Sequence, residues 1–140
     1  MKIALFGKTG QVASEVQRRA PEGVFVNAIG RDSADFTSPK MVQAIADSLD
    51  ADVIVNAVAY TAVDKAESEA DVAIAVNNLS VAALAETAAR RSIPLIHIST
   101  DYVFDGTGTT PRAPDAPTAP LGVYGSTKLA GEAAIQAANG

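Results

Sequence analysis

Short apolar runs alternate with segments of helical periodicity along most of this 140-residue chain, and this alternation constrains the fold more than any other feature. The run 3–6 ends at Gly7, and apolar residues then recur at helical spacing as far as Pro21. Similar apolar runs cover 24–29, 53–55 and 94–99. Because nearly every residue in them is apolar, we expect strands that are buried on both faces. The pattern predicts an α/β domain with a parallel sheet covered by helices on both faces.

The segments between the strands carry helix and loop signals. Ser38 as cap and Pro39 in the first turn open one helix, and 61–64 has the form of a capping box. The alanine-rich segment 72–89 is apolar on several faces, which predicts a helix covered by its neighbours. Prolines at a period of three predict an extended loop over 105–123. A polyproline II ligand for a proline-reading domain is the alternative for that loop.

Length and composition limit the number of domains and the classes of binding partner. A chain of 140 residues forms one domain, so a C-terminal substrate-binding lobe is expected to be absent from it. The net charge of −5 without a basic run argues against nucleic acid or an anionic membrane. The absence of cysteine excludes disulfides, thiol nucleophiles and thiolate metal sites. No run has the form of a signal peptide or approaches the roughly 18 residues of a membrane span, so we expect a soluble, cytoplasmic protein.

The turn after the first strand has the spacing of a dinucleotide-binding fingerprint. Gly7 and Gly10 are followed by Ala13 at the third small position. Small residues there let backbone N–H groups approach a pyrophosphate, although a plain tight turn has the same spacing. Arg31 and Asp32 follow the second strand, where an acidic side chain would bond a ribose and a basic one a 2′-phosphate. Both NAD and NADP are therefore possible cofactors. The alternative interpretation is that Arg31 and Asp32 are two solvated charges in a loop.

Three further groups have both a functional and a structural interpretation. The small residues Asn56 to Ala59 would let a flat ligand approach the carboxyl edge of the sheet, or would serve helix packing. His97 has no second histidine or cysteine to join it, so we interpret it as structural and expect no metal. The acidic side chains between Asp64 and Asp71 suit a solvated helix start.

Tyr124 and Lys128 are spaced at i and i+4, which places them on one face of a helix. The lysine ammonium could then lie beside the phenol and stabilise its phenolate form. A tyrosine in that setting can exchange a proton with a carbonyl or alcohol oxygen at neutral pH. The pair Ser99 and Thr100 ends the last predicted strand upstream of it. The spacing indicates acid–base chemistry on a carbonyl.

Taken together, the segments 7–13, 56–59, 99–106 and 124–132 make the chain similar to the extended short-chain dehydrogenase/reductase superfamily. Within it, the runs 60–67 and 99–104 most resemble the family of dTDP-4-dehydrorhamnose reductases. The resemblance covers the whole chain but only the N-terminal part of such an enzyme. It implies a Rossmann-type doubly wound parallel sheet, truncated before its later strands, over 1–140. The implied reaction is NADPH- or NADH-dependent reduction of the 4-keto group of dTDP-4-dehydro-6-deoxy-L-mannose to dTDP-L-rhamnose.

The resemblance also implies roles by position. Thr100 would orient the substrate carbonyl, Tyr124 would donate the proton, and Lys128 would tune Tyr124 and hold the nicotinamide ribose. The implied cofactor contacts run from the pyrophosphate through the adenosine to the centre of the molecule: Gly7, Gly10, Gln11, Val12, Arg31, Asp32, Asp35, Phe36, Ala57, Ala59 and Tyr60. The implied contacts to the sugar nucleotide are Thr61, Val63, Asp101 and Tyr102.

Departures from the family pattern fall at Ala13, where a third glycine is common, and in the loop at Ala113 and Gly122. Without later strands, the fourth strand is expected to present an unpaired edge, so this chain alone would be weakly active or inactive and prone to associate. A homodimer is the expected assembly.

Two other functions stay open: a non-catalytic regulatory subunit of the same superfamily, and another sugar-nucleotide epimerase or dehydratase. Retention of Thr100, Tyr124 and Lys128 favours the reductase.

Overall fold

The computed structural model describes residues 1–139, and its centre is one parallel sheet. Its strands are β1 (Lys2–Phe6), β2 (Phe25–Ile29), β3 (Val53–Asn56) and β4 (Leu95–His97). Their order is β2-β1-β3-β4 and every pairing is parallel. The predicted α/β fold class is therefore confirmed, and β4 lies at one edge of the sheet, as expected.

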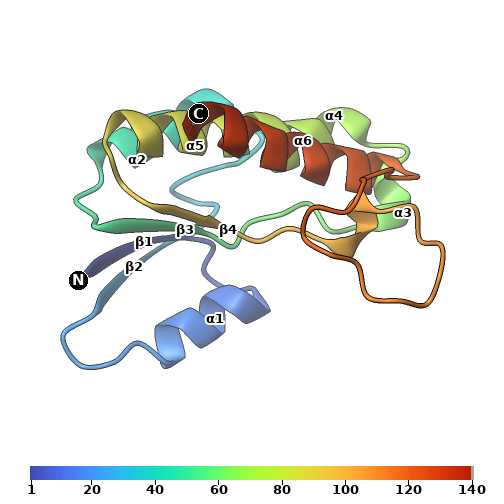
Figure 1. Cartoon of the computed structure of the whole chain (residues 1–140). Coiled ribbons are helices and arrows are strands. Elements are labelled where there is room, and N and C mark those ends of the chain that lie inside the picture. The colour runs from blue at the N-terminus through green and yellow to red at the C-terminus, as the bar shows by residue number, and fades with distance from the viewer. Residues whose placement is uncertain (140) are drawn as a thin grey trace.

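Helices cover the two faces of the sheet unequally (Figure 1). On one face, α1 (Gln11–Arg18) packs over a small core that includes Leu5 and Val55. On the other face, α2 (Pro39–Ser48) and α5 (Ser80–Arg90) cover the larger core around Phe6, and α6 (Val123–Asn139) packs beside α5. Alternate residues of β1, β2 and β3 supply the two cores, as the period of a strand requires.

The alanine-rich segment predicted as one helix is built from three pieces. It comprises α4 (Ala70–Ile74), a π-helical turn η1 (Ala75–Leu79) and α5. Ala70–Arg90 is long and apolar enough to cross a membrane by length and composition, which corrects the expectation that no such segment exists. Half of its most apolar window is buried, and its Asn77, Ser80 and Thr87 lie inside the protein. This is how a core helix of a compact domain is built.

Element boundaries differ from the prediction in a few places. The last strand is shorter than 94–99, and η2 (Asp101–Val103) follows it as a 3-10 turn. The short helix α3 (Val63–Ala66) begins after Ala62 without a side-chain cap, so the predicted capping box at 61–64 is wrong. Ser38 is the N-cap of α2 as predicted, but its side chain makes no capping bond. Residues 104–122 contain no helix or strand, as expected for the proline-rich loop.

Candidate active site

The carboxyl ends of β1, β2 and β3 meet at one edge of the sheet, where Gly7 makes the turn into α1. Its φ of +111° is strained for any residue with a side chain, and its N–H donates to Ile29 at 2.9 Å. A Cβ at Gly7 would lie 3.5 Å from both Ala13 and Ala57. These small residues keep the backbone open at the start of α1, where Gly10 offers no side chain to cap the free N–H groups. The arrangement suits an approaching pyrophosphate.

Two adjoining cavities follow this edge and contain most of the predicted cofactor residues. One of about 500 Å³ is lined by Gly7, Gly10, Arg31, Asp32, Ala57 and Ala59, among others. The next, of about 660 Å³, shares Arg31 and Ala59 and adds Asp35, Phe36 and Tyr60. Sequence reasoning therefore selected residues that share one surface, and a nucleotide of two linked halves has room to lie along it.

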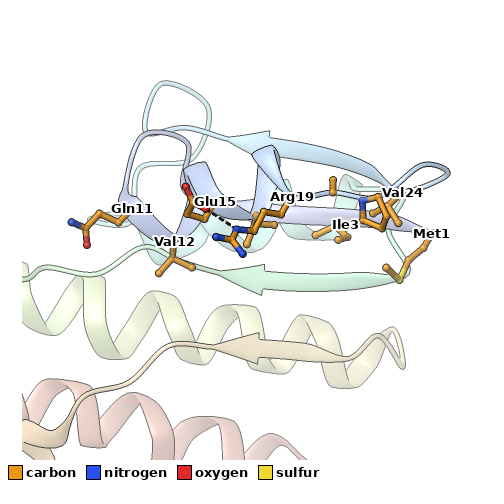
Figure 2. A pocket seen from close by; sticks show the side chains of 10 residues that line it. Met1, Ile3, Gln11, Val12, Glu15, Arg19 and Val24 are labelled. Carbon is orange, nitrogen blue, oxygen red and sulfur yellow. Dashed lines mark hydrogen bonds and ion pairs between the residues drawn. The ribbon is translucent and has the colours of Figure 1, made fainter.

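Gln11 and Val12 lie elsewhere. Their side chains line an apolar groove of about 550 Å³ between α1 and the start of β1, together with Ile3, Glu15 and Arg19 (Figure 2). Only the backbone of the first turn of α1 is adjacent to Gly10. If these two residues contact the pyrophosphate, as predicted, they do so through their backbone N–H groups and not through their side chains.

Tyr60 is held from two sides at the boundary of the larger cavity. Its backbone N–H donates to Asn77 Oδ1 at 2.9 Å, and Asn77 Nδ2 donates back to its carbonyl at 3.1 Å. Its phenol donates to Glu69 at 2.7 Å, and this bond raises the pKa of Tyr60. Lys65 pairs with the same carboxylate at 2.7 Å. Glu69 is thus a partner of Tyr60, which corrects its interpretation as part of a solvated acidic face.

Tyr124 lies in the first turn of α6 beside a third cavity, of about 370 Å³. Its ring meets the edge of the Tyr102 ring at a centroid distance of 5.4 Å. Val63 and Asp101 line the same cavity, so three of the four predicted substrate residues come together with the predicted proton donor. Thr61 is exposed and does not line it. The Thr100 hydroxyl accepts from Tyr102 N–H at 3.2 Å and so begins the η2 turn next to this cavity.

Lys128 is the second difference from the expected site. It is on the same helix as Tyr124, as predicted, but it is 1% exposed, and its ammonium is turned toward β4. There it donates to the Ile98 carbonyl and lies 3.3 Å from His97 Nε2. A buried ammonium requires acceptors, and the end of β4 provides one. The ammonium of Lys128 therefore lies away from the Tyr124 phenol, although the i, i+4 spacing suggested a direct contact.

Helix α6 is held in place by residues that sequence reasoning missed or underrated. A Cβ at Gly131 would lie 2.3 Å from Asn77 O, so α6 approaches the π-helical turn as closely as backbone allows. Asn77 Nδ2 also reaches Thr127 Oγ1 at 3.2 Å. Glu67 accepts from Val123 N–H at 2.8 Å and so caps α6, in space that Gly122 leaves free. No local pattern predicts contacts between residues this far apart in the chain.

We expect Glu67→Ala to lower the melting temperature by about 3 °C, because α6 loses the carboxylate at its N-terminus. Differential scanning calorimetry of the chain measures this. Glu86→Ala, on the exposed face of α5, is the matched control and should change the melting temperature by less than about 1 °C. Equal effects of the two substitutions would show that the cap contributes nothing.

The strand order, the glycine turn and the helix carrying Tyr124 and Lys128 define a Rossmann-type domain of the dehydrogenase class. Comparison with known proteins identifies the family within this class. The chain belongs to the RmlD substrate binding domain family, whose model matches residues 1–140.

Among curated proteins, the dTDP-4-dehydrorhamnose reductase of Salmonella typhimurium is 51% identical, over 97% of this chain and 47% of its own length. The chain thus spans about half the length of the curated relatives it matches. A solved dTDP-4-dehydrorhamnose reductase from Clostridium acetobutylicum is similar with a TM-score of 0.93 at 34% identity, over 99% of this chain and 50% of that one. A Bacillus anthracis reductase in complex with NADP has a TM-score of 0.92 at 28% identity, with the same coverage of both chains.

Proposed function

We propose that the whole protein containing this chain reduces the 4-keto group of dTDP-4-dehydro-6-deoxy-L-mannose to give dTDP-L-rhamnose, with NADPH or NADH as reductant. The observation that carries the proposal is the position of Tyr124. Tyr124 borders a cavity lined by Val63 and Tyr102, and Tyr60, which shortly precedes Val63 in the chain, borders the predicted cofactor surface. A proton donor beside a nucleotide surface is what carbonyl reduction by a nicotinamide requires.

The fit of a nicotinamide dinucleotide is supported by the space that the chain leaves for it. The residues that a Cβ at Gly7 would meet, Ala13 and Ala57, are small, and the cavities beyond the turn continue past Arg31 to Phe36. Phe36 is 4% exposed and packs edge-on against Phe6 at 5.7 Å, which makes a rigid apolar wall for an adenine. When bound, the reduced cofactor would supply the hydride.

The residues of this chain would supply the proton and the orientation. Thr100 would hydrogen-bond the substrate carbonyl, and Tyr124 would give its phenolic proton to the oxygen as charge develops there. Lys128 would hold the nicotinamide ribose and stabilise the phenolate left behind. The 5.4 Å edge contact with Tyr102 restricts the orientation of the Tyr124 ring.

The assay that tests the proposal is NADPH oxidation by the whole protein with the 4-keto sugar nucleotide, with the product identified by mass spectrometry. We expect a product two mass units heavier than the substrate. A product of unchanged mass would favour an epimerase. Nucleotide binding without turnover on this substrate would favour a regulatory subunit.

We predict that Arg31→Ala weakens NADPH binding about tenfold and NADH binding by less than twofold, because a guanidinium bond to the 2′-phosphate exists only with NADPH. The Arg31 side chain is 81% exposed beside the cavity, with Asp35 at 3.7 Å, so it is free to turn to a phosphate. Isothermal titration with both cofactors measures this. Arg18→Ala is the matched control, because Arg18 pairs with Glu15 and neither residue lines the two cofactor cavities. Equal losses of affinity for NADPH and NADH would mean that Arg31 does not bind the 2′-phosphate.

Three finer expectations remain predictions within this proposal. A C-terminal substrate-binding lobe would complete the cavity beside Tyr124, the protein would be a homodimer, and it would act in the cytoplasm. The free edge of β4 and the exposed Ile96 and Ile98 support an additional packing partner. Sedimentation of the whole protein and of this chain measures the assembly.

A further inference from the structure

Gly30, which directly follows β2, leaves space that two charged side chains occupy. A Cβ at Gly30 would lie 3.4 Å from Lys8 Cδ and 2.5 Å from Asp32 Oδ1. The stem of Lys8 therefore crosses from the glycine turn after β1 to the end of β2. Lys8, Gly30, Arg31 and Asp32 all line the cavity of about 500 Å³. Lys8 thus belongs to the surface that the adenosine end of the cofactor is expected to use, although the sequence assigned it no role.

The backbone of Lys8 is held in place, and its ammonium is unpaired. Gln17 Nε2, on α1, donates to the Lys8 carbonyl at 3.0 Å, which fixes the turn against the helix. Within residues 1–139 the Lys8 ammonium takes part in no ion pair, whereas Lys65, a cation beside the next cavity, pairs with Glu69 at 2.7 Å. A cation that is fixed at its backbone and not already paired can bind an anion with little rearrangement.

The charges in this cavity require such a cation if a phosphate is to bind there. A phosphate monoester carries about −1.5 to −2 charge at pH 7. Asp32 repels that charge, and the Arg31 guanidinium is shared with the Asp35 carboxylate at 3.7 Å. One shared guanidinium does not balance a phosphate and Asp32 together. Among the described residues, Lys8 is the other cation that lines this cavity.

We propose that Lys8 is a specificity-determining residue: its ammonium and the Arg31 guanidinium together bind the 2′-phosphate of NADPH and offset the charge of Asp32. The inference rests on the proposed function, because it takes a nicotinamide dinucleotide as the ligand. A bond from Lys8 to the pyrophosphate is the alternative, since Gly7 and Gly10 line the same cavity. The two are separable, because NADH and NADPH share the pyrophosphate and differ at the 2′ position.

Isothermal titration of the whole protein with NADPH and NADH separates the two bonds. Lys8→Met keeps the stem and removes the charge, so it should weaken NADPH binding about fivefold and NADH binding by less than about twofold. Lys8→Arg retains the charge and should bind NADPH within about twofold of the unaltered protein. Lys2→Met is the matched control, because it removes the same charge at the opposite end of β1, and it should change neither affinity by more than about 1.5-fold.

The outcomes distinguish this inference from the proposed function. Equal losses for NADPH and NADH in Lys8→Met would assign the ammonium to the pyrophosphate and overturn the inference, and so would an unchanged affinity for NADPH. In both cases the unaltered protein still binds its cofactors, so the proposed function stands. If the unaltered protein binds neither cofactor, the proposed function fails and this inference fails with it.

The ³¹P NMR signal of the 2′-phosphate in bound NADP⁺ is a direct readout of the same bond. A cation bound to a phosphate favours its dianion, so the second pKa of this group, about 6 in a free monoester, should be lower in the complex. Lys8→Met should raise that pKa by about half a pH unit, while the pyrophosphate signals keep their positions. The same 2′-phosphate titration in both saturated complexes would contradict the bond from Lys8.

Discussion

Tyr124→Phe is expected to lower turnover of the whole protein by about 10²- to 10⁴-fold, because it removes the proton donor and leaves the ring in place. The phenylalanine keeps the edge contact with Tyr102 and the packing of α6, so folding should be unaffected. Tyr124 does not line either of the two cofactor cavities, so NADPH affinity should change by less than about twofold. Initial rates and isothermal titration measure the two quantities separately.

The matched control is Tyr60→Phe, which loses a hydroxyl bound to Glu69 in the cofactor cavity. This variant should raise the KM for NADPH more than it lowers kcat, because Tyr60 touches the predicted cofactor surface and lies away from the predicted reacting carbonyl. If Tyr124→Phe retains its turnover, the phenol has no part in the reaction. If both variants lose turnover equally, the division between cofactor and substrate cavities is wrong.

Gly131→Ala is expected to destabilise the chain by about 1–3 kcal/mol, the typical cost of forcing extra volume into a packed interface. Inside a helix, alanine is otherwise favoured over glycine by about 1 kcal/mol, so the sign of the effect is diagnostic. The added Cβ would lie 2.3 Å from the Asn77 carbonyl oxygen, which belongs to the π-helical turn and cannot swing away as a side chain can. Urea unfolding followed by circular dichroism measures the free energy of unfolding.

Gly10→Ala is the control for this substitution, because a Cβ there meets nothing within 4 Å and the backbone φ is −70°. It should change the free energy of unfolding by less than about 1 kcal/mol. A Gly131→Ala variant as stable as the unaltered chain would mean that α6 does not depend on close contact with η1. Nucleotide binding by that variant should also weaken, because Asn77 holds the backbone of Tyr60.

The sequence predicted the fold well because its signals are local. The apolar run before Gly7, the helical spacing after it and the i, i+4 spacing of Tyr124 and Lys128 each depend on neighbours in the chain. They placed β1, α1 and α6 and put most cofactor residues on one surface. The segment 70–90 is longer and more apolar than the sequence interpretation allowed, and its polar Asn77 and Ser80 are buried in the fold.

The parts that the sequence did not predict depend on contacts between distant elements. Lys128 turns to Ile98 and His97 because burial demands partners that only the assembled sheet provides. Glu67 is exposed, as expected, but nothing near it in the chain indicates that α6 begins beside it and that its carboxylate caps that helix. The π-helical turn at Ala75–Leu79 has no spacing signal of its own, since it is one extra residue per turn within a continuous helix.

The most direct test of the central claim is a titration of NADPH into the ¹⁵N-labelled chain, followed by amide NMR shifts. The account predicts shifts at Gly7, Gly10, Arg31 and Ala57, which line the two adjoining cavities, and smaller ones at Tyr124 and Lys128. Val16 and Val24, which line only the groove of Figure 2, should not move. Shifts centred on that groove, or no saturable shifts with a folded chain, would contradict the assignment of a nicotinamide dinucleotide to the carboxyl edge of the sheet.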